Sequence, residues 1–333
     1  MFPRTLRVFV VGVVAALALD EIVVRLFVPV RNVGPSFSEY DPVYGKSLKK
    51  NFSCTRITPE FRMSFTTNSL GHRGPEPAAP LERGILFLGD SFTEGYGVND
   101  GEEFPALVRE ALRARYGQAA PAVINAGVGH VGNGRWLKFL RLEGKRYDPQ
   151  VIVLQLSGND FADNISDRLF TLSDVGTLME HDPPPPGAFR HVQWFIEAVP
   201  GLSYSYLVGL IREAYYFMSV SQHTTGRDEA EEARINRLTF RIIEEIVRLC
   251  QQQQWPLAVV IVDFETDRLQ EMKAILERHN VPHIVPPAKS ERPDLYYTVD
   301  GHWNKDGHEL VAFQVLEMLA SLGIPKTELH ATP

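Results

Sequence analysis

The stretch Gly84-Ile-Leu-Phe-Leu-Gly-Asp-Ser-Phe-Thr-Glu-Gly95 decides the fold class of this 333-residue chain. The short apolar run Ile85–Leu88 ends in a Gly-Asp-Ser turn, which predicts a buried strand with Ser91 at its carboxyl end. Ligand crevices of open α/β sheets lie at this end of the strands. Ser91 is therefore the first candidate for a reactive residue.

From this stretch onward, apolar runs alternate with segments of helical spacing. Further strands are expected at 122–124, 151–156, 257–264 and 281–285, and helices at 104–116, 135–146, 227–253, 266–279 and 306–322. Strands that alternate with helices form a parallel sheet with helices on both faces. The sequence therefore predicts an α/β domain over 84–325, whose last helix begins with a capping box of Asp306 and Glu309.

Two regions depart from this alternation. An aromatic-rich stretch at about 165–222 is interpreted as a helical insertion packed on the domain. A lid or a membrane-facing surface is the alternative, because exposed aromatic residues need a partner. The segment 31–83 is rich in Pro, Gly and Ser and is expected to be an irregular lead-in. His72 and Arg73 would then lie in a surface loop.

The first 30 residues have the composition of a targeting segment. Arg4 and Arg7 precede the apolar run Val8–Leu19, which is shorter than the ~20 residues that cross a bilayer. A signal anchor, giving a single transmembrane helix with the domain on the periplasmic side, is one interpretation. A cleaved signal peptide, giving a secreted protein, is a second, and a buried N-terminal helix is a third.

Charge and cysteine content exclude several functions. The chain has 34 Lys and Arg against 41 Asp and Glu, so its net charge is −7. This balance argues against a nucleic-acid partner. Cys54 and Cys250 have no metal-binding pattern and can form one disulfide or none, and the histidines lack the spacing of metal ligands. We expect no metal and no cofactor.

The end of the chain supplies partners for the candidate serine. A serine hydroxyl is a weak nucleophile that needs a base, and the base needs an orienting group. Asp300-Gly301-His302 precedes the last expected helix. His302 would take the proton from Ser91, and Asp300 would fix the imidazole tautomer. His308, in the first turn of that helix, is expected to be a local cap.

Two further turns carry groups that can hold an oxyanion, a task of backbone amides and amide side chains. Asn159 follows the expected strand 151–156, and the glycine-rich turn Asn125–Gly132 follows the strand before it. Gly127 to Gly132 also fits a dinucleotide-binding fingerprint. We disfavour that interpretation because the next strand does not end in an acidic residue. An α/β-hydrolase elbow is excluded because Thr93 stands where it needs glycine.

Four ordered blocks resemble those of the SGNH/GDSL hydrolase family: Gly89-Asp90-Ser91, Asn125–Gly132, Gly158-Asn159-Asp160 and Asp300-Gly301-His302. The resemblance implies a flavodoxin-like three-layer α/β/α fold and a Ser91–His302–Asp300 triad. It also implies an oxyanion hole made by the Ser91 amide, Asn159 and a glycine-turn amide, which Gly129 or His130 could donate.

Two details refine the resemblance. Asp41-Pro-Val-Tyr-Gly45, Asn68-Ser-Leu-Gly71 and Arg73-Gly74 resemble the lead-in of a membrane-anchored bacterial branch. The Asp-x-His spacing of Asp300 and His302 is one residue shorter than the family's commonest spacing. It is similar to that of alginate-type O-acetyltransferase relatives.

Together these features predict a serine-dependent acyl-ester hydrolase that acts outside the cytoplasmic membrane, on a glycan or lipid ester of the cell envelope. An O-acyltransferase that moves acetyl groups onto a polysaccharide is the first alternative, because it uses the same residues. A non-catalytic glycan-binding scaffold is the second, since fold resemblance alone does not prove activity.

Overall fold

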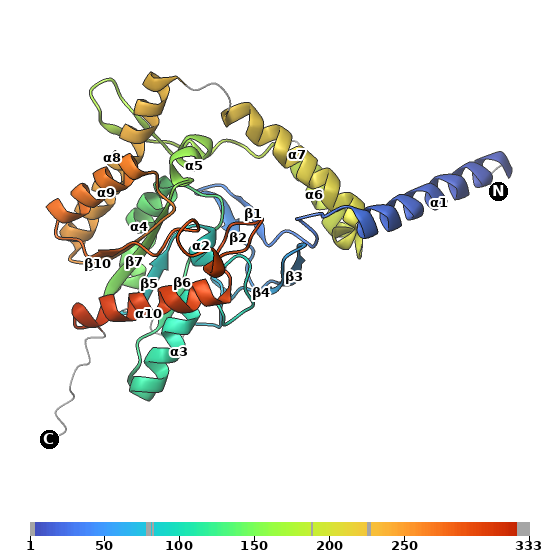
Figure 1. Cartoon of the computed structure of the whole chain (residues 1–333). Coiled ribbons are helices and arrows are strands. Elements are labelled where there is room, and N and C mark those ends of the chain that lie inside the picture. The colour runs from blue at the N-terminus through green and yellow to red at the C-terminus, as the bar shows by residue number, and fades with distance from the viewer. Residues whose placement is uncertain (1–3, 78–80, 82, 188, 225–227, 325–333) are drawn as a thin grey trace. The chain divides into compact units, whose positions relative to one another are not determined.

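The computed structural model describes residues 4–77, 81, 83–187, 189–224 and 228–324 (Figure 1). The chain divides into two compact units. The helical unit comprises Met1–Ser36, Cys54–Met63 and Pro186–Arg227, and the sheet unit comprises Phe37–Ser53, Ser64–Pro185 and Asp228–Pro333.

The sheet unit is built on a five-stranded parallel sheet of order β11-β10-β7-β5-β6. Its strands are β5 (Ile85–Leu88), β6 (Val123–Asn125), β7 (Val151–Ser157), β10 (Leu257–Val262) and β11 (His283–Ile284). In the register, Leu86 of β5 lies between Ile124 of β6 and Ile152 of β7. Counted along the chain, the strands follow the order 2-1-3-4-5, which is the flavodoxin-like order. The predicted fold class is confirmed.

Helices cover both faces of this sheet and complete three layers (Figure 1). On one face, α3 (Phe104–Tyr116) and α10 (Lys305–Ser321) pack on alternate strand residues such as Phe87, Val153 and Val260. The opposite face carries α4 (Asn133–Tyr147), α5 (Asp160–Asp167), α8 (Glu229–Gln253) and α9 (Thr266–Arg278). Strands buried on both faces read as continuous apolar runs, which explains why the sequence revealed them.

The start of α10 differs from its prediction. Asn304 is the N-cap, and its side-chain oxygen accepts a hydrogen bond of 3.1 Å from the Gly307 N–H. The capping box predicted from Asp306 and Glu309 is wrong, because the helix begins at Lys305 and an asparagine already occupies the cap position.

The lead-in 31–83 contains more regular structure than its composition predicted. Its strands are β1 (Ser38–Asp41), β2 (Gly45–Leu48), β3 (Ser53–Ile57) and β4 (Arg62–Thr66), and β1 and β2 form an antiparallel hairpin. The Asp41 carboxylate accepts hydrogen bonds from the Val43 and Tyr44 N–H groups, at 2.8 and 2.9 Å, and from the Ser47 hydroxyl. Asp41 therefore fixes the turn that orients β2.

The short elements that remain in the sheet unit are α2 (Ser91–Glu94), η1 (Gly117–Ala119), β8 (Phe170–Leu172), β9 (Leu178–Glu180) and η3 (Pro293–Leu295). No disulfide joins Cys54 and Cys250, and both thiols are buried.

The helical unit contains α1 (Arg4–Phe27), α6 (Phe189–Ala198), η2 (Leu202–Tyr204) and α7 (Tyr206–Thr224). The Glu21 carboxylate of α1 accepts hydrogen bonds from the Tyr206 and Leu207 N–H groups at the start of α7, both at 3.0 Å. Val24 and Val33 are buried nearby. A carboxylate at a helix N-terminus satisfies orphan donors, so this contact joins the two helices.

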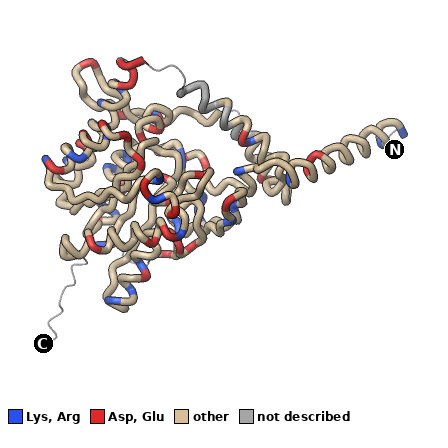
Figure 2. Tube along the Cα trace, viewed as in Figure 1, with Lys and Arg blue, Asp and Glu red and all other residues tan. Residues whose placement is uncertain are grey.

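Figure 2 shows charged residues at the N-terminal end of α1 and again in its second half, and residues 8–19 between them carry no charge. Among the helices that the structure describes, none combines the length and apolar character that crossing a membrane requires. The transmembrane helix expected from the first 30 residues is therefore not supported.

Candidate active site

Ser91 begins α2, directly after β5, in a turn that is held by buried side chains. The Asp90 carboxylate accepts hydrogen bonds from the Phe92 N–H, at 2.9 Å, and from the Ser157 hydroxyl. The Asp90 N–H in turn donates to the side-chain oxygen of Gln155 at 3.0 Å. Ser91 itself is 8% exposed. Groups from β7 thus fix the position of a serine that still reaches the surface.

The structure brings Ser91, His302 and Asp300 into one chain of hydrogen bonds. Ser91 Oγ lies 2.6 Å from His302 Nε2, and His302 Nδ1 lies 2.5 Å from Asp300 Oδ1. With its Nδ1–H donated to the carboxylate, the imidazole presents Nε2 as an acceptor for the serine proton. This is the geometry needed to activate a serine hydroxyl.

Gly301 makes the short Asp-x-His spacing workable. Its φ of +89° lies in the left-handed region, which glycine adopts without a steric penalty. The resulting turn lets Asp300 reach the ring of His302 across a single residue. The Tyr297 N–H donates to the His302 carbonyl at 2.9 Å, and the rings of Phe92 and Tyr96 flank the imidazole.

Asn159 lies at the start of α5, beyond the carboxyl end of β7. Its carboxamide oxygen lies 2.6 Å from the Ser157 hydroxyl oxygen, whose single proton also faces Asp90, and its NH₂ group donates to Asp163 Oδ2 at 2.7 Å. The hydrogen bond to Asp163 therefore orients the carboxamide. Burial, and then the nearby Asp167 carboxylate, raise the pKa of Asp163 to about 7.

The glycine-rich turn passes directly beside Ser91. A Cβ atom added to Gly129 would stand 3.2 Å from the Ser91 Cβ, which leaves little room for a side chain. The Gly129 N–H donates to Glu94 Oε2 at 2.6 Å. His130, the second predicted donor, has a φ of +55° and an exposed side chain. The structure therefore places Gly129 beside the serine but directs its N–H toward Glu94.

Two charged residues beside this turn were not singled out from the sequence. Glu94, the last residue of α2, is 2% exposed, and burial raises its pKa, although Lys46 and the Gly129 N–H act in the opposite direction. Lys46, on β2, donates from Nζ to the Gly129 carbonyl at 2.6 Å. No local pattern could reveal Lys46, because 83 residues separate it from Gly129.

Arg73 supports the segment that follows Ser91, and its side chain is fully buried. Its guanidinium donates to the carbonyl oxygens of Gly95 and Val98, at 2.5 and 2.7 Å. His72 is also buried, with Nε2 2.8 Å from the Tyr147 hydroxyl. The predicted surface-loop role of His72 and Arg73 is wrong, because buried acceptors satisfy these polar groups.

His308 lies outside the site and is not a helix cap. Its side chain is fully buried, and Nδ1 accepts a hydrogen bond of 3.2 Å from the Phe104 N–H at the start of α3. Burial lowers its pKa to about 3, so the imidazole is neutral. The prediction that His308 caps its own helix is therefore wrong, and His308 instead links α10 to α3.

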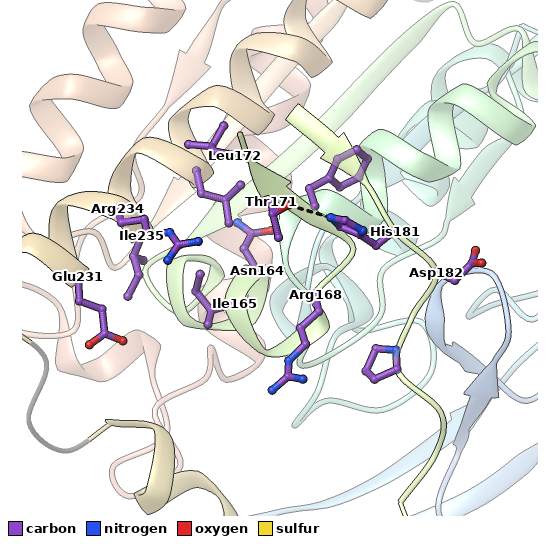
Figure 3. Close-up of a pocket in the computed structure, with 13 residues that line it drawn as sticks. Asn164, Ile165, Arg168, Thr171, Leu172, His181, Asp182, Glu231, Arg234 and Ile235 are labelled. Carbon is purple, nitrogen blue, oxygen red and sulfur yellow. Dashed lines mark hydrogen bonds between the residues drawn. The ribbon is translucent and has the colours of Figure 1, made fainter. Parts of the chain in front are cut away.

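A separate cavity of about 480 Å³ lies beside α5 (Figure 3). Ile165 and Arg168 line it from α5 and the residue that follows, and Ile235 lines it from α8. The hydrogen bond between Thr171 and His181, of 2.8 Å, lies at its wall. None of its lining residues belongs to the Ser91 hydrogen-bond chain, so this cavity is distinct from the reactive centre.

Residues 87–310 match the GDSL-like Lipase/Acylhydrolase family. The chain belongs to this family. The match covers more than half of the sequence and includes Ser91, Asp300 and His302. This member of the GDSL family is therefore a serine esterase or acyltransferase. Among the described residues, no group of three or more His, Cys, Asp or Glu side chains is arranged to hold a metal ion.

Several solved structures are similar to this chain. The psychrotrophic esterase EstA from a Pseudoalteromonas species is 14% identical with a TM-score of 0.43, and the alignment covers 72% of this chain and 98% of that one. TesA is 11% identical with a TM-score of 0.43 over 72% and 99% of the two chains. CEX, a two-domain esterase active on acetylated mannans, is 14% identical with a TM-score of 0.41 over 72% and 50%. No curated protein matched.

Proposed function

We propose that this GDSL-family enzyme hydrolyses acyl esters outside the cytoplasmic membrane, with Ser91 as the nucleophile. The observation that carries the proposal is the hydrogen-bond chain from Ser91 Oγ to His302 Nε2, at 2.6 Å, and from His302 Nδ1 to Asp300, at 2.5 Å. A serine placed in this way can lose its proton to the imidazole as it attacks a carbonyl carbon.

The reaction proceeds in two halves. Ser91 Oγ bonds to the ester carbonyl carbon while its proton moves to His302 Nε2, and the imidazolium is stabilised by Asp300. The tetrahedral intermediate then collapses, and His302 returns the proton to the departing alcohol. Water repeats these steps on the acyl-enzyme, and the acid leaves Ser91.

The negative charge of each tetrahedral intermediate requires donors beside Ser91. We assign this task to the Ser91 N–H, to an N–H of the glycine turn and to the second N–H of the Asn159 carboxamide. The hydrogen bond from the Asn159 NH₂ group to Asp163 supports its part, because it holds the carboxamide in one orientation.

An ester of a cell-envelope glycan or lipid is the proposed substrate. The support is the N-terminal sequence, in which Arg4 and Arg7 precede an apolar run that suits an export signal. Export would leave the enzyme facing the envelope, either retained there by its N-terminal segment or secreted after signal cleavage. Export followed by cleavage predicts a mature chain that lacks this segment.

O-acyl transfer is the second candidate. The Asp-x-His spacing of Asp300 and His302 favours it, through the resemblance to O-acetyltransferases. Transfer and hydrolysis share the acyl-enzyme and differ in whether a sugar hydroxyl or water takes the acyl group.

The test uses the 333-residue chain with p-nitrophenyl acetate, butyrate and octanoate, with and without an oligosaccharide acceptor. We expect turnover that Ser91→Ala reduces by about 10³-fold or more, while Ser166→Ala, an exposed serine of α5, leaves it unchanged. Mass spectrometry of the acceptor distinguishes transfer from hydrolysis. Turnover that survives Ser91→Ala would overturn the proposal, and absence of Ser91-dependent turnover in folded protein would favour the glycan-binding scaffold.

A further inference from the structure

The Gly129 residue of the glycine turn is held from both sides by charged side chains. Its N–H donates to Glu94 Oε2 and its carbonyl accepts from Lys46 Nζ, each over 2.6 Å. Charge-assisted hydrogen bonds of this length are among the stronger ones in proteins. Since Gly129 packs against Ser91, the two side chains fix the backbone that borders the reactive serine.

The carbonyl of Gly129 and the N–H of His130 belong to the same peptide group. In a trans peptide these two groups point in opposite directions. A carbonyl held by Lys46 therefore sets the direction of the His130 N–H. The ammonium charge on the carbonyl oxygen also polarises the peptide, because hydrogen bonds in a chain strengthen one another.

We propose that Lys46 and Glu94 are positioning residues of the oxyanion hole, and that the glycine-turn donor is the His130 N–H. The Gly129 N–H is committed to Glu94, so it is poorly placed to turn toward an oxyanion. Lys46 raises the donor strength of the His130 N–H, and Glu94 keeps the preceding peptide from rotating. This inference rests on the proposed function, since an oxyanion must form at Ser91.

Through Lys46, the lead-in 31–83 supports the oxyanion hole. Lys46 lies on β2, outside the segment 87–310 that matches the family. The Asp41 turn fixes the hairpin, and Arg135 donates to the Lys46 carbonyl, so the backbone that carries the ammonium is held in place. Burial lowers the pKa of the Lys46 ammonium, while the carboxylates of Glu94, Asp167 and Asp163 act in the opposite direction.

The central experiment compares Lys46→Met with Lys50→Met, a matched change at an exposed lysine of the same segment. We expect Lys46→Met to lower kcat for p-nitrophenyl acetate about tenfold, less than the 10²–10³-fold cost of losing a direct oxyanion donor. KM should stay within about twofold, because the lost interaction strengthens only in the transition state. Lys50→Met should match the wild type.

Two further variants separate positioning from folding. Lys46→Arg keeps a charged donor and should recover part of the lost kcat, whereas a role in packing alone predicts no such rescue. Glu94→Gln keeps an oxygen that can accept the Gly129 N–H, so we expect a smaller fall in kcat, of about threefold. Thermal unfolding of each variant reports whether the fold is intact.

A fluorophosphonate probe provides a readout that does not need a good ester substrate. Ser91 Oγ displaces fluoride from phosphorus, His302 takes the proton, and the phosphoryl oxygen occupies the oxyanion position. Intact-mass measurements should show slower labelling of Lys46→Met than of the wild type, and no labelling of Ser91→Ala.

The outcomes separate this inference from the proposed function. Equal kcat and equal labelling rates for the wild type and a folded Lys46→Met would overturn the inference alone, provided that Ser91→Ala is inactive. A rise in KM with unchanged kcat would also overturn it, because it would assign Lys46 to substrate binding. Wild-type protein that neither turns over esters nor reacts at Ser91 would overturn both proposals.

Discussion

Ser91 and His302 are held in different ways although they lie within one hydrogen bond of each other. The turn that carries Ser91 depends on buried groups from elsewhere in the chain, namely Gln155 of β7 and the fully buried Arg73. The His302 side chain is 20% exposed, and its contacts include Asp300 and Tyr297 of the same loop.

This difference predicts that changes around the Ser91 turn chiefly reduce stability, whereas changes in the His302 loop chiefly reduce activity. Removing a buried partner of the Ser91 turn leaves polar groups without compensation inside the protein, so it weakens the whole unit. Changes in the His302 loop affect groups that water can reach, so the fold tolerates them while the alignment of the imidazole suffers. The predictions below test this separation, in order of decreasing effect.

Asp300→Asn should have the largest effect on activity and almost none on stability. An asparagine at this position can donate to Nδ1 and thereby favour the wrong imidazole tautomer, so we expect kcat/KM to fall about 10³–10⁴-fold. The free energy of unfolding should change by less than about 1 kcal/mol, because the loop is partly exposed. Ester kinetics and urea unfolding provide the two measurements, with Asp294→Asn in the exposed η3 region as the control. A large loss of stability would show that the His302 loop, like the Ser91 turn, contributes to holding the fold together.

Arg73→Met should chiefly reduce stability. The guanidinium bridges the carbonyls of Gly95 and Val98 and lies 3.2 Å from Asp100. Its removal leaves buried carbonyl acceptors and the buried Glu103 carboxylate, 3.9 Å away, without their cation, which costs about 3–5 kcal/mol. Urea unfolding measures this loss, and Arg113→Met, at an exposed arginine of α3, should stay within about 0.5 kcal/mol of the wild type. If Arg73→Met were as stable as the control, the buried network would not be what fixes the Ser91 turn.

Gly301→Ala should show a smaller effect that falls mainly on catalysis. At a φ of +89°, alanine is strained by about 1–3 kcal/mol. The loop can relax toward solvent, so we expect kcat to fall about tenfold for 1.4 kcal/mol of misalignment. Gly323→Ala is the matched control, because Gly323 also has a positive φ, of +65°, and no atom lies within 4 Å of its added Cβ. Equal kcat in both variants would mean that the strain at Gly301 does not reach His302.

The contrast also explains what the sequence could and could not reveal. The strands and helices of the sheet unit, and the loops that carry Ser91, Asn159 and His302, follow from hydrophobic periodicity and turn residues, which are local signals. Lys46 was missed, and Arg73 was assigned to a surface loop, because charged residues in a glycine-rich segment normally lie at the surface. Arg73 is fully buried and Lys46 is partly buried, and both donate to carbonyls far away in the sequence, which no local pattern encodes.

Asp163 gives the smallest predicted effect and tests a third part of the site, the start of α5. Burial and Asp167 raise the pKa of Asp163 from 3.8 to about 7, and burial raises that of Asp167 to about 6. At pH values between 3.8 and about 7, these carboxyl groups hold protons in the folded protein that they have released in the unfolded chain. The free energy of unfolding must therefore fall as the pH rises through this range.

Asp163→Asn removes one of the two carboxyl groups that titrate in this range. The amide oxygen of the new side chain can still accept the Asn159 N–H. We expect the variant to gain stability relative to the wild type between about pH 5 and about pH 8, measured by urea unfolding at both values. Asp174→Asn, an exposed control, should show no such pH-dependent gain. Retained kcat in Asp163→Asn would mean that the hydrogen bond, rather than the charge, orients Asn159. A pH-independent difference in stability would instead show that Asp163 is already ionised at the lower pH.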